Sequence, residues 1–458
     1  MIQHVVVLGA GESGRGVALL AQAEGHRVRV SDAGEVSPAA RAELEAAGIP
    51  YEGGGHSVDD LDAVTVVVKS PGIPWEAEFV ALARARGLPV LGEMEFCARH
   101  ARDRYRRGRR IGITGSNGKT TTTLLVGHLL REAGVAVAVC GNVGTSYARC
   151  LLTPDAYDVY VMELSSYQLE DIRDFSVDIG MVLNLSPDHL DRYGGRFDAY
   201  AAAKYRLKRT QRRSTFWLQA ADPLSLRHAP EAPPGVREIR MPKVFEAGYA
   251  VTASRVYGLA GTALAGPHNA ANASFALTAA ECAIATTYDG TEATRVQGVL
   301  ATALRSFRNA PHRLELVGEA GGVAYVNDSK ATNLDAVAKA LASYERPIVW
   351  IVGGTDKGND YGAIAPLVEA RVKAVVALGA DNAKLERVYG GFPGGFRSVA
   401  SMKDAIFSAQ AFADAGDVVL LSPACASFDL FRDYRDRGEQ FRAGVEALPD
   451  FAPAPTRE

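Results

Sequence analysis

The residues with the clearest chemical potential form a glycine-rich loop that ends in lysine and threonine. Residues 111–114 have the pattern of a strand, residues 115–121 (GSNGKTT) form the loop, and a helix follows through residue 130 and ends at Gly134. In such a loop the backbone N–H groups can surround phosphate oxygens, the lysine can reach the β and γ phosphates, and the threonine hydroxyl can bind Mg²⁺. The loop is shorter than the usual phosphate loop, because its first glycine is residue 115 rather than residue 113. We therefore predict that ATP is bound by Gly115, Ser116, Asn117, Gly118, Lys119, Thr120, Thr121 and Thr122.

Two polar residues follow apolar strands further along the chain. Glu163 ends the run 159–163 (VYVME), in phase with its two valines, and His189 follows the apolar run 181–185. A carboxylate in phase with buried residues is costly unless it is paired or binds a metal. A histidine at a strand end is often only a hydrogen-bonded structural residue, so both interpretations of His189 stay open. The phosphate loop and Glu163 favour a metal-binding role at the carboxyl edge of the sheet.

Lys204 is unusual because it shares a helix face with apolar residues. In the predicted helix 197–209 it lies on the same face as Phe197, Tyr200 and Ala201. A lysine in that position usually extends its charged end to solvent. A buried lysine with a lowered pKa is instead the kind that reacts covalently. The residues alone leave both alternatives open.

A second glycine loop lies near the start of the chain. Residues 9–14 (GAGESG) follow a strand and begin a helix, and Asp32 ends the next strand about 20 residues later. Such a loop brings a helix N-terminus close to a diphosphate, and a full dinucleotide-binding fold would take NAD or FAD. The pattern ends after about ninety residues, enough for one mononucleotide-binding half, so a single nucleotide diphosphate such as a UDP-sugar fits better. A glycine-rich turn without a ligand is the remaining alternative. The candidate contacts are Gly11, Ser13, Asp32 and, after the third strand, Gly72.

The elements that must position these residues alternate between strand and helix, which predicts parallel βαβ units. We therefore predict an α/β fold of three domains. They are a Rossmann-like N-terminal half-domain at residues 1–95, a central P-loop ATPase-like domain at 96–308, and a Rossmann-like C-terminal domain at 309–458. The predicted strands are 5–8, 28–30, 64–68, 88–91, 110–114, 159–163, 178–185, 323–326, 348–352, 372–378 and 418–422, and the main predicted helices are 17–24, 197–209 and 269–285.

An arginine-rich segment joins the first two domains. Residues 98–110 contain seven arginines, and Tyr105 is the aromatic residue among them. A nucleic-acid patch would interleave several aromatic residues for base stacking, whereas a charge run of this kind is usually exposed to solvent. We therefore expect a solvated linker.

Composition and charge exclude several classes of protein. The chain has 458 residues, of which 47% are hydrophobic and 22% charged, and its net charge is −3. These values exclude a disordered chain and argue against a general nucleic-acid binder. The five cysteines are dispersed and include no C-x-x-C pair, so we expect neither a disulfide framework nor a zinc site. No apolar run reaches membrane-spanning length and the first glycine loop begins at residue 9, so we expect a cytoplasmic protein without a signal peptide.

The motifs taken together resemble the ATP-dependent Mur ligase family. The resemblance spans nearly the whole chain and keeps the family's order of motifs. It rests on residues 115–121, 163–166 (ELSS), 184–192 (NLSPDHLDR), 200–204 (YAAAK), 266–272 (GPHNAAN), 311–313 (PHR) and 327–333 (NDSKATN). The first glycine loop, residues 353–358 (GGTDKG) and residues 422–429 (SPACASFD) are similar to those of the family members that add D-glutamate.

The resemblance implies an amide ligase of peptidoglycan precursor synthesis. The L-alanine carboxylate of UDP-N-acetylmuramoyl-L-alanine would attack the γ-phosphate of ATP, and the amine of D-glutamate would then attack the resulting acyl phosphate. Cations are needed because the carboxylate must approach a triphosphate of like charge. The resemblance implies one Mg²⁺ held by Thr120 and Glu163 and a second held by His189 and Lys204, with the lysine carbamylated by CO₂.

Further residue roles follow from the matching motifs. Tyr434 stands where we expect phenylalanine in this family. Since the ATP and D-glutamate contacts come from different domains, we expect the domains to close and exclude water during the reaction. The resemblance assigns catalytic roles to Lys119, His189, Lys204 and Lys330, ATP contacts to Asn272, Arg313 and Asp328, and substrate contacts to Asn142, Ser165, Gln168, Thr332, Lys357, Ser427 and Tyr434.

Other activities compete with this interpretation. The alternatives within the family are a ligase for another amino acid and a folylpolyglutamate-type ligase, although folates carry no diphosphate for the loop 9–14. An NAD-dependent oxidoreductase is disfavoured by the single half-domain and the phosphate loop. A nucleotide-dependent regulatory protein would leave Glu163, His189 and Lys204 without a role. We expect a monomer that binds neither nucleic acid nor membranes.

Overall fold

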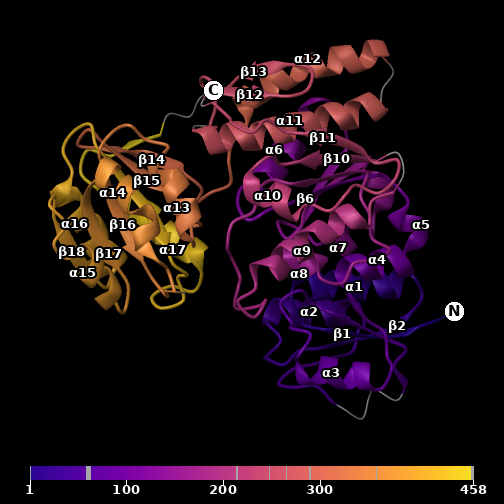
Figure 1. The fold of residues 1–458 in the computed structure, drawn as a ribbon. Helices are drawn as coiled ribbons and strands as arrows, with labels where there is room; N and C mark the ends of the chain where they lie inside the picture. Colours follow the sequence, from indigo (N-terminus) through magenta and orange to yellow (C-terminus); the bar gives the residue numbers. More distant parts are fainter. Residues whose placement is uncertain are drawn as a thin grey trace. The chain divides into compact units, whose positions relative to one another are not determined.

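The computed structural model describes residues 2–57, 63–212, 215–246, 248–264, 266–287, 290–356 and 358–454. The chain forms two compact units, the first built mainly from residues 1–245 and 271–307 and the second mainly from residues 308–458. The first unit contains a five-stranded and a six-stranded parallel sheet, and the second contains a seven-stranded mixed sheet (Figure 1). This arrangement confirms the predicted α/β class. The domain boundaries at residues 95/96 and 308/309 stay a prediction.

The N-terminal sheet has the strand order β3-β2-β1-β4-β5, and all its pairs are parallel. Its central strands are rich in valine because both of their faces are buried, as is usual in parallel sheets. Helices α1, α2 and α4 cover one face and α3 covers the other (Figure 1). The bounds are β1 His4–Leu8, α1 Glu12–Ala23, β2 Arg27–Ser31, α2 Pro38–Ala46, β3 Tyr51–Glu52, β4 Val66–Lys69, α3 Glu78–Ala85, β5 Val90–Gly92 and α4 Glu93–His100.

The central sheet has the parallel order β11-β10-β9-β6-β8-β7. Strand β6 therefore lies between β8 and β9, and the carboxyl ends of these three strands meet at one edge, where ligands bind in open α/β sheets. The bounds are α5 Arg102–Tyr105, β6 Arg109–Thr114, α6 Lys119–Glu132, β7 Val137–Gly141, α7 Tyr147–Cys150, β8 Val159–Glu163, α8 Ser166–Leu169, β9 Ile179–Val182, α9 Phe197–Arg209, β10 Phe216–Gln219, α10 Pro223–His228, β11 Arg237–Arg240, β12 Tyr249–Val251, β13 Val256–Gly258, α11 Pro267–Thr287 and α12 Gly290–Ser306.

The C-terminal sheet has the order β18-β17-β16-β19-β15-β14-β20, in which β14 runs antiparallel to both of its neighbours. Helices α13, α14 and α15 pack on one face and α16 and α17 on the other. The bounds are β14 Glu315–Ala320, β15 Val323–Asn327, α13 Leu334–Leu341, β16 Ile348–Gly353, α14 Ala365–Arg371, β17 Val372–Leu378, α15 Ala383–Tyr389, β18 Phe396–Val399, α16 Met402–Phe412, β19 Val418–Ala424, α17 Tyr434–Glu446 and β20 Ala452–Pro453.

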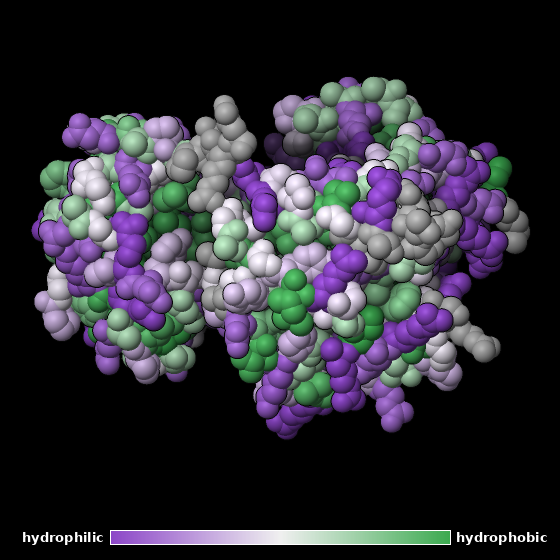
Figure 2. All heavy atoms as spheres, turned by 90° about the horizontal axis from the view of Figure 1, so that it is seen from above, coloured by the Kyte–Doolittle hydropathy of each residue, from purple (hydrophilic) through white to green (hydrophobic). Residues whose placement is uncertain are grey.

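Most predicted elements are confirmed to within a few residues, and the predicted helix 197–209 coincides with α9. The glycine loop 9–14 begins a helix, as expected, because α1 starts at Glu12 with Gly11 as its N-cap, and the predicted segment 17–24 is therefore five residues short at its start. No described helix combines the length and the apolar character that a membrane crossing requires. Figure 2 shows hydrophobic residues in small groups between hydrophilic ones on the face that it presents.

The expectation of a solvated linker at residues 98–110 is wrong. Helices α4 and α5 occupy most of this segment, and Arg99, Arg104 and Arg110 have partners, whereas Arg102 and Arg106 are exposed. Arg99 contacts Glu95 at 2.6 Å, and Arg104 contacts Glu24 at 2.6 Å. The guanidinium of Arg110 lies over the ring of Tyr105. Part of the charge run therefore forms a packed seam between the first two sheets, in which Arg104 reaches Glu24, a partner that is distant in sequence.

Glu93, the first residue of α4, is buried in this seam. It is 2% exposed, and its Oε1 accepts a hydrogen bond of 3.0 Å from the backbone N–H of Ala148 at α7. The hydroxyl of Ser13, a predicted substrate contact, lies beside the same carboxyl. Burial raises the pKa of Glu93 from 4.5 to about 7. The carboxyl therefore links the N-terminal and central sheets. The free-energy cost of burying it is higher when it is ionised than when it is protonated.

We predict that replacing Glu93 changes the pH dependence of stability. Because the folded-state pKa lies above the unfolded-state value, the folded chain binds more protons between pH 4.5 and about 7, and the free energy of unfolding falls as the pH rises through this window. Glu93→Gln should remove this fall, which is roughly 3 kcal/mol at most. Urea unfolding at several pH values measures it, with the exposed Glu132→Gln as the control. Equal slopes in the wild type and Glu93→Gln would contradict the prediction.

Candidate active site

The phosphate loop after β6 is fixed by the segment that follows β9. Asn117 and Asn184 exchange two hydrogen bonds, of 2.9 Å to the Asn117 N–H and 3.0 Å to its carbonyl. The Ser116 hydroxyl donates to the carbonyl of Ser186 at 2.9 Å and accepts from its N–H at 2.9 Å. These reciprocal bonds tie the loop between β6 and α6 to the segment after β9.

Lys119 and Asn272 lie at the same loop. The Nζ of Lys119 donates to the carbonyls of Gly115 at 3.0 Å and Ser116 at 2.9 Å. Gly118 has φ 84°, and a Cβ at this position would lie 2.3 Å from the Oδ1 of Asn272 on α11. The left-handed backbone therefore favours glycine at position 118, and a larger residue would also have to displace the Asn272 side chain. The structure brings the predicted ATP contact Asn272 against the predicted loop, although they are about 150 residues apart in sequence.

Glu163 lies at the end of β8 beside the first residues of α6. Its Oε2 accepts a hydrogen bond of 2.6 Å from the Thr120 hydroxyl, and its Oε1 accepts one of 2.7 Å from the Asn142 side chain. A hydroxyl and a carboxylate are hard oxygen donors of the kind that Mg²⁺ prefers. The described residues contain no group of three or more His, Cys, Asp and Glu side chains that could hold a metal alone. Thr120 and Glu163 therefore fit a Mg²⁺ that takes its other ligands from water and phosphate.

Lys204 is buried, which decides between the two alternatives that its helix face left open. It is 1% exposed, and its Nζ donates to the carbonyl of Gly115 at 2.8 Å and lies 4.6 Å from the ring centroid of Tyr200. Burial, together with the charge of Lys119, holds the pKa of Lys204 well below its usual value. A neutral amine is the form that reacts with CO₂, so this environment is suited to carbamylation.

His189 has a strained backbone and a partly exposed ring. Its φ is 51°, in the left-handed region, and its Nδ1 lies 3.1 Å from the Tyr167 hydroxyl. Its Nε2 is 3.7 Å from Asp188. Backbone strain at a residue other than glycine is often associated with function. The sharing of one metal ion by His189 and Lys204 stays a prediction.

Two predicted substrate contacts form a helix cap. The Ser165 hydroxyl accepts from the Gln168 N–H at 3.3 Å, and the Gln168 Oε1 accepts from the Ser165 N–H at 3.0 Å. This reciprocal capping box starts α8 directly after β8 and fixes the chain that leaves Glu163. The cap gives both residues a structural role, and their contact with substrate stays a prediction.

Asp32 braces the first glycine loop. Its two carboxylate oxygens accept the N–H groups of Ala10 at 2.6 Å and Gly34 at 2.9 Å. A Cβ on Gly14 would lie 1.8 Å from the carbonyl of Gly9, so only glycine permits this close return of the chain. The space around a Cβ at Gly11 is open. The loop therefore has the compact form and open mouth of a diphosphate-binding turn.

Arg192 connects the edges of the two sheets of the first unit, and the sequence motif gave it no separate role. It donates to the carbonyls of Gly72 at 3.3 Å and Ile73 at 3.2 Å and pairs with Glu170 at 3.0 Å. Its guanidinium lies 4.8 Å from the ring centroid of Tyr167. The predicted contact Gly72 is thus held against the segment that carries His189.

In the second unit, Asp328 follows β15 and is buried. Its carboxylate accepts from the Leu314 N–H at 3.2 Å and from the Ser422 hydroxyl at 3.1 Å, and Arg313 lies nearby. Burial raises the pKa of Asp328 to about 7. His312, Leu314 and Ala424 have positive φ values, which places backbone strain in these motif segments.

Lys330 and Tyr434 also meet in this unit. The Nζ of Lys330 lies 3.8 Å from the ring centroid of Tyr434, a cation–π contact that a phenylalanine ring would also provide. Ser427 is buried and Thr332 half-buried. Phe428 beside them is 74% exposed. Lys357, the other predicted contact in this part of the chain, lies outside the described residues.

Arg437 on α17 lies outside every motif in the sequence. It is 1% exposed and donates to Ser329 Oγ at 3.0 Å, to the Ser329 carbonyl at 2.8 Å and to the Cys425 carbonyl at 3.2 Å. It also reaches the Gly353 carbonyl at 3.4 Å. Burial lowers the pKa of Arg437 to about 10. One guanidinium therefore joins the three loops that carry the C-terminal motifs, a role that only the folded chain reveals.

We predict that Arg437→Met strongly destabilises the second unit, by roughly 3–5 kcal/mol, because several buried carbonyls lose their donor. Arg437→Lys should lose less, because it keeps the charge and gives up the planar fork. Chemical unfolding of the full chain measures both effects. Arg432→Met, at a side chain that is 89% exposed, is the matched control and should change little. Equal stability of Arg437→Met and Arg432→Met would overturn this role.

Comparison with known protein families finds three matches in series. Residues 3–92 match the Mur ligase MurD-like N-terminal domain, residues 113–280 match the Mur ligase middle domain, and residues 312–425 match the Mur ligase glutamate ligase domain.

Curated relatives match over nearly the full length. A UDP-N-acetylmuramoylalanine–D-glutamate ligase from Cytophaga hutchinsonii is 42% identical, over 96% of this chain and 98% of the relative. The protein of the same name from Porphyromonas gingivalis is 42% identical over the same shares, and that from Salinibacter ruber is 40% identical over 97% and 98%.

Solved structures share the fold at lower identity. A pseudomurein peptide ligase type C from Methanothermus fervidus matches with a TM-score of 0.60 at 17% identity, covering 98% of this chain and 100% of that one. A UDP-N-acetylmuramate-alanine ligase from Thermotoga maritima matches with a TM-score of 0.58 at 18% identity, covering 96% and 98%. These two likenesses support the three-domain α/β architecture.

Proposed function

The chain belongs to the Mur ligase family, and from this premise we propose that it is the ATP-dependent ligase that joins D-glutamate to UDP-N-acetylmuramoyl-L-alanine in peptidoglycan precursor synthesis. The observation that carries this proposal is the end-to-end match with several D-glutamate ligases at about 40% identity. The proposal is supported by the phosphate loop, by Glu163 beside it and by the buried Lys204. The reaction of an NAD-dependent oxidoreductase does not require this set of groups.

The reaction requires a weak nucleophile to attack a polyanion. The alanyl carboxylate attacks the γ-phosphorus, which releases ADP and gives an acyl phosphate. The amine of D-glutamate then attacks the acyl carbon, and the tetrahedral intermediate expels phosphate to leave an amide. Lys119 and the loop N–H groups offset the charge that gathers on the phosphates. Mg²⁺ held by Thr120 and Glu163 supplies further charge neutralisation when it is bound.

We assign the remaining roles from the matched motifs. A second Mg²⁺ at His189 and a carbamate on Lys204 is the arrangement that we propose, supported by the buried amine. The UDP part of the substrate is assigned to the first glycine loop with Gly11, Ser13, Asp32 and Gly72, and the muramoyl-alanine part to Asn142, Ser165 and Gln168. ATP contacts are assigned to Asn272, Arg313 and Asp328, and D-glutamate contacts to Lys330, Thr332, Lys357, Ser427 and Tyr434.

We further propose that the enzyme is a monomer in the cytoplasm. The described cysteines are all free, which is in keeping with a reducing compartment. Sedimentation of the purified chain tests the oligomeric state.

The proposed activity predicts a strict amino-acid requirement. With Mg²⁺, ATP and UDP-N-acetylmuramoyl-L-alanine present, phosphate release should depend on D-glutamate and should be at least 100-fold slower with L-glutamate, D-aspartate, L-lysine or meso-diaminopimelate, because a site built for one stereoisomer misplaces the amine of the others. A panel assayed by phosphate release measures this. Equal turnover with L-glutamate or diaminopimelate would transfer the chain to another member of the family.

Lys204 provides a second prediction. Lys204→Ala should lower kcat by at least 1000-fold, and added acetate or propionate should restore part of it, because a free carboxylate can occupy the place of the carbamate. Lys208→Ala, one turn later on α9, is a control that removes a buried lysine paired with Glu238 instead of the loop. Full activity in Lys204→Ala would refute the carbamate role, and rescue of Lys208→Ala by acetate would show that rescue is non-specific.

A further inference from the structure

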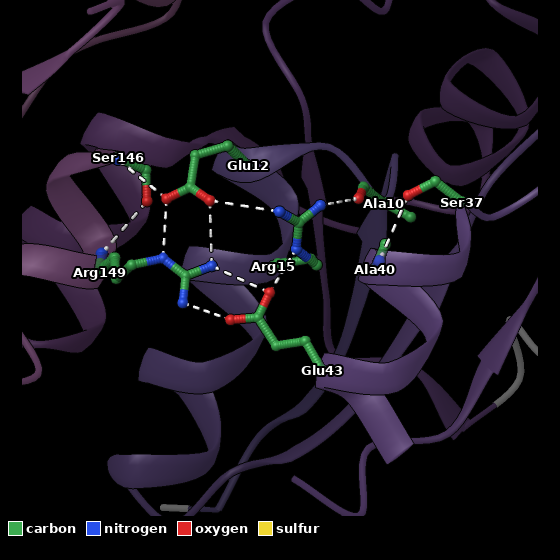
Figure 3. Close-up of polar contacts among 8 residues, drawn as sticks. All are labelled: Ala10, Glu12, Arg15, Ser37, Ala40, Glu43, Ser146 and Arg149. Carbon is green, nitrogen blue, oxygen red and sulfur yellow. Dashed lines mark hydrogen bonds and ion pairs between the residues drawn. The ribbon is translucent and has the colours of Figure 1, made fainter. Parts of the chain in front are cut away.

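An ion-pair network joins helix α1 of the N-terminal sheet to helix α7 of the central sheet (Figure 3). The Arg149 guanidinium donates to Glu12 with Nε at 2.7 Å and Nη2 at 3.1 Å. It also donates to Glu43 on α2, with Nη1 at 2.5 Å and Nη2 at 3.2 Å. One guanidinium therefore holds two carboxylates in paired geometry, which is the strong form of such contacts.

A second arginine connects this network to the first glycine loop. Arg15 contacts Glu43 at 2.5 Å and Glu12 at 3.4 Å, and its Nη1 donates to the carbonyl of Ala10 at 2.7 Å (Figure 3). The four charged side chains are between 19% and 37% exposed. Partial burial weakens the screening of these charges by water and salt. Their interaction is therefore stronger than that of an ordinary surface ion pair. The N-terminal glycine loop is thus attached to Arg149 through Ala10, Arg15 and the two glutamates.

The charge states of the network agree with this geometry. Burial raises the pKa of Glu12, but the hydrogen bonds from Arg149 and Ser146 outweigh it and lower the pKa overall. The hydrogen bond from Arg149 is the main reason why the pKa of Glu43 is lowered. Both glutamates are therefore anionic at neutral pH.

The central-sheet side of the network leads to the metal-binding carboxylate. The Ser146 N–H donates to Glu12 at 3.1 Å, and a Cβ on Gly16 would lie 2.1 Å from the Ser146 Oγ, so α1 approaches α7 closely only because residue 16 is glycine. Four residues before Ser146, Asn142 donates to Glu163 at 2.7 Å. One short stretch of chain therefore connects the N-terminal glycine loop to the Thr120–Glu163 pair.

The negative charge of Glu12 lies at the N-terminus of α1, and Arg149 neutralises it. It is the first residue of α1, the position where a helix N-terminus favours a bound anion. Its own carboxylate would repel a diphosphate at that place. In the structure the carboxylate turns to α7, where Arg149 neutralises it.

We propose that Arg149 is a positioning residue for the nucleotide-diphosphate end of the substrate. It holds the Glu12 carboxylate away from the first glycine loop. Through this contact it also fixes the loop against α7, at a defined position relative to Asn142 and Glu163. The inference rests on the proposed function in one respect, namely that the loop 9–14 binds a diphosphate. It assigns a role to Arg149 and Glu43, which lie outside both glycine motifs, and to Glu12, which occupies a non-glycine position of the first motif.

The alternative is that the network only stabilises the seam, and a set of variants separates the two. Arg149→Met should raise KM for UDP-N-acetylmuramoyl-L-alanine about tenfold, because Glu12 loses its paired contact with Arg149 and keeps only the 3.4 Å contact with Arg15 and the Ser146 N–H, so its charge is less neutralised beside the diphosphate. KM for ATP should stay within about a factor of two. The double variant Glu12→Gln/Arg149→Met should recover most of this loss, since the repelling charge is gone. Arg149→Lys keeps the charge without the fork and should fall between the wild type and Arg149→Met.

Arg104 supplies a matched control. It pairs with Glu24 at 2.6 Å just beyond the opposite end of α1, about 18 Å from Glu12 at 1.5 Å per residue, and the two side chains are 29% and 23% exposed. Arg104→Met should lower the melting temperature by an amount similar to Arg149→Met and leave KM for the UDP-linked substrate unchanged. Thermal unfolding and initial-rate kinetics on the same preparations provide both readouts.

Three results would overturn the proposal. They are an unchanged KM in Arg149→Met, an equal rise of KM in Arg104→Met, and a double variant no better than the single one. If Arg149→Met fails to fold, the comparison of Arg149→Lys with Glu12→Gln/Arg149→Lys decides in the same way. Failure of the proposed function is a separate result, because the wild-type chain would then show no phosphate release that depends on D-glutamate.

Discussion

The architecture of the candidate site depends on one constraint, that the parallel strands β6, β8 and β9 end at a common edge. The phosphate loop leaves β6, Glu163 ends β8, and the segment with Asn184 and His189 follows β9. Each of these groups is therefore fixed by backbone hydrogen bonds before any ligand contact is made. The carbonyl of Gly115 accepts a hydrogen bond from the buried amine of Lys204. This contact brings α9 to the same edge of the sheet. A parallel sheet places these groups together more rigidly than loops alone could do.

Buried basic side chains organise both units in a similar way. In the first, the Lys204 amine donates to a carbonyl of the phosphate loop, and in the second, the Arg437 guanidinium donates to carbonyls of the motif loops. The N–H donors of a buried side chain must find acceptors, so the loops around it can adopt few conformations. Lys204 differs in that burial also favours its neutral and reactive form. The free-energy cost of burying a basic side chain thus leads to rigid loops around Arg437 and to a reactive amine at Lys204.

Patterns that are local in sequence were predictable, and those made by tertiary pairing were not. The phosphate loop, the strand-end Glu163 and the face of helix 197–209 follow from spacing alone, and the structure places them together. The segment 98–110 looked like a solvated linker in part because the partner of Arg104, Glu24, is distant in sequence. Arg149 and Arg437 had no signal for the same reason. The segment 17–24 covers only the later part of α1, whose start at Glu12 lies in the glycine pattern 9–14 that was expected to begin a helix.

Conversion of the alanyl carboxylate to an acyl phosphate can be followed by oxygen-isotope transfer. UDP-N-acetylmuramoyl-L-alanine labelled with ¹⁸O in its terminal carboxylate is converted to product with ATP, Mg²⁺ and D-glutamate, and the released phosphate is analysed by mass spectrometry. We expect one ¹⁸O atom in each phosphate released, because the carboxylate oxygen that attacks the γ-phosphorus leaves with it. Product formation with unlabelled phosphate would rule out an acyl phosphate, since the amide would then have formed without a carboxyl–phosphate bond.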